Sequence, residues 1–344
     1  MLGRINFLSD SPAIYPDLTA GGPMNQKIKP IVTAALLVFV MLPVLPVLAQ
    51  RQYDTDILKD TFAFDDSTPR SVDFDKLVQA CPVRDCIRSI DNPRFVTSDQ
   101  AGFLNADDLI LGVVIGGDVR AYPAKILDHH EIVNDTVGGK PIAITYCPLC
   151  GSGVAVSRVI GGVVTEFGVS GVLYNSDLVI YDRASNTLWS QIEGAGVVGP
   201  NTGKKLQTLP VTMTRWSRWQ KKHPGSKVLS ADTGFDEDYS VDRFAEYRAG
   251  TRIYLPVSDE DDRVHPKTVV FGTSIGGQPV AVAEAAFKNT SRIEASLAGR
   301  DLTLSMAEDG TVTIGDSDSR EKWSTGRLFW FAWYTFNPST ELVQ

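Results

Sequence analysis

Two short runs of this sequence carry the side chains best suited to chemistry. Cys147 and Cys150 stand in the run Cys-Pro-Leu-Cys-Gly, and His129, His130 and Glu131 form the other run. The chain has only four cysteines and four histidines. Because thiolates and imidazoles together bind zinc or copper, we expect a metal site formed by Cys147, Cys150 and His130. His129 is a further candidate ligand, and Glu131 is expected beside the site or as a proton carrier.

The residues around the cysteine pair predict a tight turn between two strands. Residues 141–146 and 153–158 are β-type runs, and Cys-Pro-x-Cys-Gly resembles the metal-binding knuckle of rubredoxins and zinc ribbons. A redox Cys-x-x-Cys pair instead stands at a helix N-terminus, which lowers the thiol pKa, and no helical period follows here. Two alternatives remain: a periplasmic thiol–disulfide redox protein using Cys147 and Cys150, and a non-enzymatic binding module in which they form a structural disulfide.

Two acidic residues and a second cysteine pair are further candidates. Asp177 and Asp182 flank one apolar strand pattern, and either side chain would move protons if that strand lay beside the cysteines. Hydrogen bonding within turns is the ordinary alternative for both. Cys81 and Cys86 bracket a short polar stretch, and in an exported protein we expect them to form a local disulfide.

The N-terminal region predicts export from the cytoplasm. Residues 31–49 form an uncharged apolar run that follows Lys27 and Lys29 and ends in Val-Leu-Ala. This pattern is typical of a signal peptide over residues 24–49, with Met24 as its initiator and cleavage after Ala49. A permanent membrane anchor is the alternative. We expect a periplasmic or secreted protein with no stable membrane insertion after cleavage.

An internal repeat predicts the domain organisation. Residues 110–127 and 270–287 align without gaps at an offset of 160, and each contains a Gly-Gly pair between β-type runs. The second copy lacks both the His-His-Glu run and the cysteine pair. We expect an α+β, predominantly β fold with two related β-rich modules from an internal duplication. The expected parts are a non-mature N-terminus (1–49), an arm (50–94), a site-bearing module (95–255), an acidic linker (256–263) and a degenerate second module (264–344).

Charge and composition narrow the class of partner. The net charge is −8, with 33 Lys and Arg against 41 Asp and Glu, and there is no Lys/Arg run. Nucleic-acid binding is therefore not expected, because its affinity comes largely from basic contacts to phosphates. A metal ion or a small molecule is the expected partner, and the sequence specifies no protein partner.

Several longer runs resemble the domain-of-unknown-function family 3179. They are Asp128 to Asp135 (DHHEIVND), Thr145 to Gly151 (TYCPLCG), Val169 to Arg183 (VSGVLYNSDLVIYDR) and shorter runs such as Leu188 to Gln191. The resemblance implies exported prokaryotic proteins without an established activity. Its signature positions correspond to His130, Glu131, Asn134, Asp135, Cys147 and Cys150. His129 falls where the family more often has an aromatic residue, and Cys81 and Cys86 where it usually has glycines.

Overall fold

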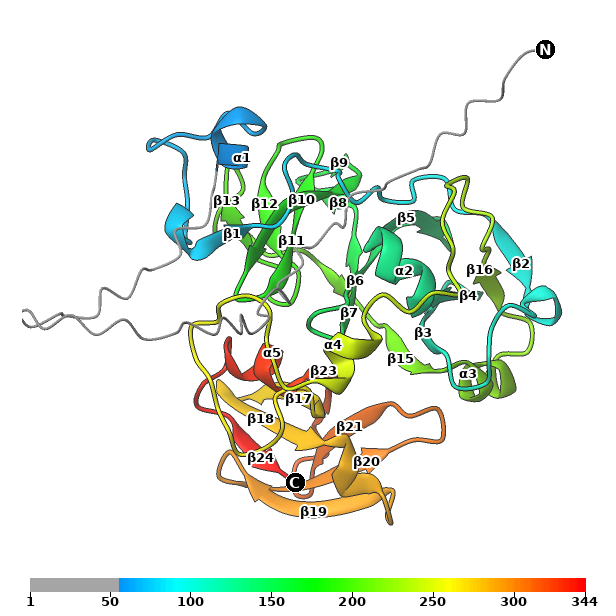
Figure 1. The fold of residues 1–344 in the computed structure, drawn as a ribbon. Helices are drawn as coiled ribbons and strands as arrows, with labels where there is room; N and C mark the ends of the chain where they lie inside the picture. Colours follow the sequence, from blue (N-terminus) through cyan, green and yellow to red (C-terminus); the bar gives the residue numbers. More distant parts are fainter. Residues whose placement is uncertain (1–55) are drawn as a thin grey trace, which may run out of the picture. The chain divides into compact units, whose positions relative to one another are not determined.

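Strands account for most of the regular structure in residues 56–344, the residues that the computed structural model describes (Figure 1). The expectation of a predominantly β, α+β fold is confirmed. The predicted signal peptide and its cleavage site lie outside the described residues. None of the helices in the described part is long and apolar enough to cross a membrane. The α-helices are α1 (Asp56–Asp60), α2 (Ala124–His130), α3 (Trp216–Lys222), α4 (Ala245–Ala249) and α5 (Trp330–Tyr334), with 3-10 turns at Phe74–Lys76, Ser98–Gln100 and Glu284–Phe287.

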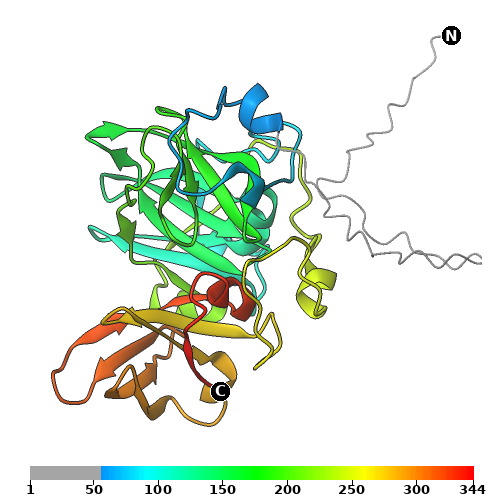
Figure 2. The ribbon, with the colours of Figure 1, turned by 90° about the vertical axis from the view of Figure 1, so that its left-hand side faces the viewer.

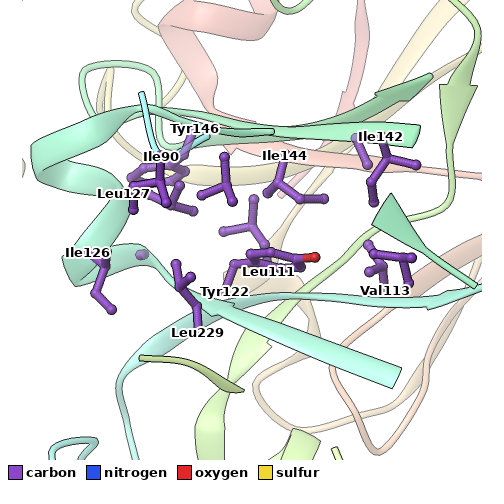
Figure 3. Close-up of a cluster of buried hydrophobic side chains, with 14 of the residues drawn as sticks. Ile90, Leu111, Val113, Tyr122, Ile126, Leu127, Ile142, Ile144, Tyr146 and Leu229 are labelled. Atoms are coloured by element: carbon purple, nitrogen blue, oxygen red, sulfur yellow. The ribbon is translucent and has the colours of Figure 1, made fainter. Parts of the chain in front are cut away.

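Two sheets and helix α2 enclose the core that fixes the cysteine turn. The first sheet has the order β15 (Thr212–Arg215), β3 (Leu109–Ile115), β4 (Asp118–Pro123), β16 (Lys227–Leu229) and β2 (Phe95–Thr97). The second has the order β14 (Thr208–Leu209), β7 (Ser152–Ser157), β6 (Lys140–Cys147) and β5 (Ile132–Val137). Leu111 and Tyr122 of the first sheet face Ile142 and Ile144 of the second across this core (Figure 3). Burial of the apolar face of β6 therefore sets the position of Cys147, its last residue.

A third sheet supplies the strand pair that meets the cysteine turn. Its order is β1 (Leu77–Gln79), β10 (Phe167–Tyr174), β11 (Asp177–Asp182), β12 (Leu188–Ser190) and β13 (Gly196–Val198), and a small hairpin of β8 (Val159–Ile160) and β9 (Val163–Val164) precedes β10. The arm joins this sheet because Leu77 pairs with Tyr174. Asn134 of β5, in the second sheet, bonds to the first residue of β10 and so connects the second and third sheets. The Asn134 side-chain amide accepts the Phe167 N–H at 2.9 Å and donates to the Phe167 carbonyl at 2.8 Å.

The C-terminal part forms two more sheets, drawn in gold, orange and red in Figures 1 and 2. One has the order β23 (Gly326–Phe329), β17 (Val269–Ile275), β18 (Gln278–Ala283) and β24 (Glu341–Val343). The other has the order β19 (Arg292–Leu297), β20 (Arg300–Met306), β21 (Val312–Asp316) and β22 (Lys322–Ser324). Residues such as Val280, Val282, Leu302 and Leu304 bury a separate core between them.

The strand registers of the two modules repeat at the offset seen in the sequence. Ile110 pairs with Pro123 in the first module, and Val270 pairs with Ala283 in the second. Val137 likewise pairs with Lys140, and Leu297 with Arg300. The correspondence shifts by one residue after the cysteine turn. Tyr146 pairs with Gly153, so an offset of 160 would pair Met306 with Thr313, but Met306 pairs with Val312. These registers support the predicted duplication, which itself stays a prediction.

A tryptophan contact also recurs outside the aligned runs. In the first module Trp219 packs so closely on Gly112 that a Cβ there would lie 2.3 Å from its ring. In the second, Trp333 covers Gly272 in the same way, with the ring 2.6 Å from such a Cβ. Each indole N–H donates to a hydroxyl just before the next strand: Trp219 to Ser226 at 3.0 Å, and Trp333 to Thr340 at 2.8 Å.

Candidate functional site

The cysteine pair stands on the expected tight turn between two strands. Cys147 ends β6 and pairs with Ser152, the first residue of β7. Gly151 has φ +58°, in the left-handed region that glycine adopts readily, which lets the chain reverse within a few residues. Both cysteines are free thiols, and they are 2% and 0% exposed. The sulfurs therefore lie in a dry interior.

Asp177 reaches the same point from the β10–β11 hairpin. Asn175 and Ser176 both have positive φ, +53° and +60°, as a two-residue hairpin turn requires. This turn starts β11 at Asp177, which is fully buried. One sulfur from each cysteine and one carboxylate oxygen of Asp177 all lie within 4.8 Å of one another. The condition under which Asp177 was a candidate proton carrier, a position beside the cysteines, is met in the described structure, and the role itself stays a prediction.

The turn carbonyl of Ser176 is a fourth polar atom at this cluster. The Cys150 thiol donates to it at 3.3 Å, and the Cys147 thiol lies 3.9 Å away. The Ser176 hydroxyl donates to the Leu255 carbonyl at 2.7 Å. Asn175 accepts from both the N–H and the hydroxyl of Ser258, at 2.9 and 2.8 Å. Residues 255–258 therefore hold the turn in place over the sulfurs.

The cluster is acidic, and burial keeps Asp177 and Cys150 protonated. Asp177 Oδ2 accepts the Ile192 N–H at 3.0 Å and the Ser190 hydroxyl at 3.3 Å. Its Oδ1 has no hydrogen-bond partner among the described residues. Loss of hydration raises the pKa of Asp177 to about 8, more than these hydrogen bonds lower it. Burial likewise raises the pKa of the Cys150 thiol well above its usual value, and the neighbouring Cys147 adds to this.

Two side chains from elsewhere in the chain, Gln191 and Tyr247, hold the cysteine turn. Gln191 links its two strands, accepting the Ser152 hydroxyl at 2.8 Å and donating to Thr145 Oγ1 at 3.2 Å. The hydroxyl of Tyr247, which is part of helix α4, donates to the Leu149 carbonyl at 3.0 Å. These bonds satisfy polar groups of the turn that water cannot reach.

The second module supports the turn from the other side. The Phe329 N–H donates to the Cys150 carbonyl at 2.8 Å. The Phe329 ring packs against Gly151, where a Cβ would come within 2.9 Å of it. Gly151 is therefore needed both for its backbone conformation and for this close approach.

The predicted histidine ligands lie elsewhere in the fold. Both ring nitrogens of His130 are engaged: Nδ1 lies 2.7 Å from the Arg88 carbonyl, and Nε2 lies 2.6 Å from the Tyr239 hydroxyl. Neither histidine belongs to the group of ligand atoms at the cysteines among the described residues. His129 contacts Glu237 through Nδ1 at 3.2 Å. The described structure thus places the carboxylate of Asp177, and not the imidazole of His130, beside the two sulfurs, and metal binding by any of these residues stays a prediction.

Glu131 and Asp182 occupy structural positions. Glu131 ends helix α2 with φ +56°, and its carbonyl accepts the Tyr146 N–H at 2.8 Å. Asp182 accepts the indole N–H of Trp189 at 3.0 Å and the backbone N–H of Ser185 at 2.7 Å. Neither belongs to the cysteine cluster within residues 56–344. Hydrogen bonding within a turn, the alternative interpretation of Asp182, describes what this side chain does.

The expected disulfide between Cys81 and Cys86 is present. It lies against the β10 backbone, where a Cβ on Gly171 would come within 3.2 Å of the Cys81 side chain. The disulfide therefore closes a short loop of the arm that packs against the third sheet, and it takes no part in the cluster at Cys147.

The sequence runs that form this site match a known protein family. The sequence model of the family described as "Protein of unknown function (DUF3179)" matches residues 84–340. The chain belongs to the DUF3179 family. No curated protein and no solved structure matches the chain.

The residues that the resemblance singled out fall into two groups in the structure, those at the cysteine cluster and those that connect elements around it. Cys147 and Cys150 provide the buried sulfurs, whereas His130, Asn134 and Asp135 tie elements together. Asp135, for example, accepts the Tyr122 hydroxyl at 2.5 Å and Arg120 at 2.7 Å.

Three residues of the site escaped the sequence analysis, namely Ser176, Gln191 and Tyr247. The Asn-Ser-Asp turn and the Trp-Ser-Gln run were visible in the sequence, but neither pattern indicates which strands meet the cysteines.

Proposed function

We propose that this DUF3179 protein is an exported metal-binding protein that holds zinc between Cys147, Cys150 and Asp177. The carrying observation is the convergence of two thiols and a carboxyl group within 4.8 Å in a fully buried place. Buried acidic groups without a cation are costly, because each must remain protonated or carry an unsolvated charge. A divalent cation offsets two of the three negative charges that the deprotonated groups would carry, and it also satisfies Asp177 Oδ1.

The donor chemistry favours zinc over copper. Zinc accepts thiolate sulfur and carboxylate oxygen together, whereas copper(I) prefers sulfur ligands. The Ser176 carbonyl is suitable as a fourth donor, since its distances to the two sulfurs are 3.3 and 3.9 Å. A tetrahedral zinc with Zn–S of about 2.3 Å and Zn–O of about 2.1 Å requires roughly 3.6 Å between such donors. Four protein donors make a closed site, which is suited to holding a metal rather than to turnover.

Thiol–disulfide exchange is the second candidate, supported by the two free thiols beside a carboxyl group that can accept a proton. Three observations weigh against it. The sulfurs are inaccessible to a partner's disulfide, the pKa of Cys150 is raised rather than lowered, and the turn between β6 and β7 provides no helix N-terminus.

Metal analysis of protein purified from the periplasm tests the proposal. We expect one zinc per chain, no titratable thiol at Cys147 and Cys150, and an S2O2 ligand shell by X-ray absorption. Cys150→Ser and Asp177→Asn should each lose the metal. Asp182→Asn, which alters a buried carboxylate on the same strand, should keep it once folding is verified by circular dichroism.

The alternatives give different results in the same measurements. One copper per chain would support the proposed site but contradict zinc as its metal. A metal-free protein with a reversible two-electron thiol couple would favour the redox function, and an inert Cys147–Cys150 disulfide would favour a binding module. Export is tested separately: the N-terminus of the periplasmic protein should be Gln50, and an intact cytoplasmic product starting at residue 1 would contradict it.

A further inference from the structure

A cavity lies beside the cysteine turn and is lined by side chains that do not belong to the proposed metal site. Its volume is about 460 Å³, within the range typical of small-molecule sites. Helix α2 contributes Lys125 and Asp128, β6 contributes Tyr146, helix α4 contributes Arg248, and β23 contributes Arg327. The cavity is therefore assembled from both modules.

Asp128 is a buried acid that lacks a close partner. Its side chain is only 7% exposed, and its Oδ1 makes no hydrogen bond with any described residue. The nearest cationic atom, Arg248 Nη1, is 3.7 Å away, and Arg248 bonds instead to Asp242 through its other terminal nitrogen. Burial raises the pKa of Asp128 to about 7 despite the Arg248 charge. A ligand with an N–H donor would satisfy this carboxyl group.

Arg327 provides the opposite charge in the same cavity. Its guanidinium has no ion pair or side-chain hydrogen bond to any residue in the described range 56–344. The charges of Asp128, Arg248 and Arg327 all act on the Tyr146 hydroxyl, so this phenol lies among them. The remaining cation, Lys125, is bound to Asp108 at 2.6 Å. One carboxyl group and one guanidinium thus remain for a ligand.

We propose that this cavity binds a small zwitterion, an amino acid or a dipeptide, with its ammonium group on Asp128 and its carboxylate on Arg327. Arginine binds carboxylates through paired N–H donors, and a buried carboxylate is the usual partner of an ammonium ion. A ligand with a single charge would leave either the buried carboxyl group of Asp128 or the half-buried guanidinium of Arg327 unpaired, whereas a zwitterion pairs both. The inference does not depend on the metal, because none of these side chains belongs to the Cys147–Cys150–Asp177 cluster.

Equilibrium dialysis of the full chain tests this inference. The probes are the twenty standard L-amino acids with Gly-Gly, Ala-Ala and Gly-Leu, and bound molecules are quantified by mass spectrometry. We expect at least one of these zwitterions to be retained at one per chain. Asp128→Asn and Arg327→Met should each weaken its binding at least tenfold. Arg320→Met, which removes an exposed arginine outside the cavity, should leave binding unchanged.

Modified probes test the assignment without altering the protein. The N-acetylated form of the retained molecule lacks the ammonium group, and the C-terminal amide form of the same molecule lacks the carboxylate. Each of these two derivatives should bind at least tenfold more weakly than the unmodified molecule. Asp128→Asn should not weaken the N-acetylated form further. Retention of no probe, equal binding of the N-acetylated form, or equal binding by wild type and both cavity variants would overturn the proposal.

Discussion

The charge of the cysteine cluster depends on three acidic groups that are buried together, the thiols of Cys147 and Cys150 and the carboxyl group of Asp177. Asp177 and Cys150 both have raised pKa values because of burial, so the metal-free protein holds protons there at neutral pH. A metal must displace those protons, and unfolding releases the proton of Asp177 into water. Both processes are therefore pH-dependent, with signs that follow from the shifts.

The stability of the metal-free protein should fall as pH rises from about 4 to about 8. The pKa of Asp177 is about 8 in the folded state and near 3.8 when unfolded, so the folded state alone keeps the proton across this window. The stabilising contribution is complete below pH 4 and is lost as pH rises through 8. In urea melts, Asp177→Asn should gain a few kcal/mol relative to wild type between pH 5 and pH 8. Parallel pH profiles for the two proteins would contradict the burial of a protonated Asp177.

Metal affinity should change with pH in the opposite direction. Two thiols and one carboxyl group must release protons before they bind a metal, so the apparent affinity should increase as pH rises through 8. Competition with a chromophoric zinc chelator between pH 6 and 9 measures the slope. Asp177→Ser should bind more weakly and show a shallower slope by about one proton. An affinity independent of pH would mean that the metal binds outside this cluster.

At the scale of elements, the side chains of Trp219 and His130 hold two helices in position against the rest of the first module. The Trp219 indole covers Gly112 of β3 and fixes helix α3 on the first sheet. The His130 ring joins the end of helix α2 to the Arg88 carbonyl and to Tyr239. These contacts position the elements around the site without touching the sulfurs.

Gly112→Ala should destabilise the protein by about 1–3 kcal/mol, because the new Cβ would overlap the indole. The nearest Trp219 atoms would lie 2.3 to 2.6 Å from that Cβ. Gly102→Ala is the matched control, since nothing lies within 4 Å of a Cβ there, and its effect should stay within about 0.5 kcal/mol. Chemical denaturation compares the two variants. Equal stabilities would mean that α3 can move away from β3 at little cost.

His130→Phe should keep the metal but lose about 1–3 kcal/mol of stability. Phenylalanine retains the ring and removes the contacts to the Arg88 carbonyl and the Tyr239 hydroxyl, at 2.7 and 2.6 Å. Zinc content and thermal melting are measured on the same preparation. Loss of zinc from a well-folded variant would return His130 to the set of ligands.

At the scale of the whole molecule, the two modules share a framework but differ in what their turns do. The first module's turn provides two sulfurs. In the second, Cys147 and Cys150 correspond to Ala307 and Gly310 at the offset of 160. The turn there carries Asp309, which accepts Lys222 of the first module at 2.6 Å. The second module thus contacts the first through this turn and through Phe329 at Cys150.

The sequence predicts local features of this molecule better than distant contacts. The cysteine turn and the Cys81–Cys86 disulfide follow from a few neighbouring residues, and both were predicted. The choice between His130 and Asp177 depends instead on which hairpin meets that turn. His130 is close to the cysteines in sequence, but the helix that carries it ends with its ring against Arg88 and Tyr239. Only the packing of the third sheet brings Asp177 to the sulfurs.

The segment that closes over the site should give zinc, if it binds there as proposed, a long residence time. Tyr247 bonds to the cysteine turn, and residues 255–258 bond to the hairpin turn above it, so the sulfurs have no open path to solvent. A chelator must then wait for this segment to lift. Zinc release should follow first-order kinetics with a rate independent of chelator concentration, and Tyr247→Phe should accelerate it. A rate proportional to chelator concentration would mean that the chelator reaches the metal directly.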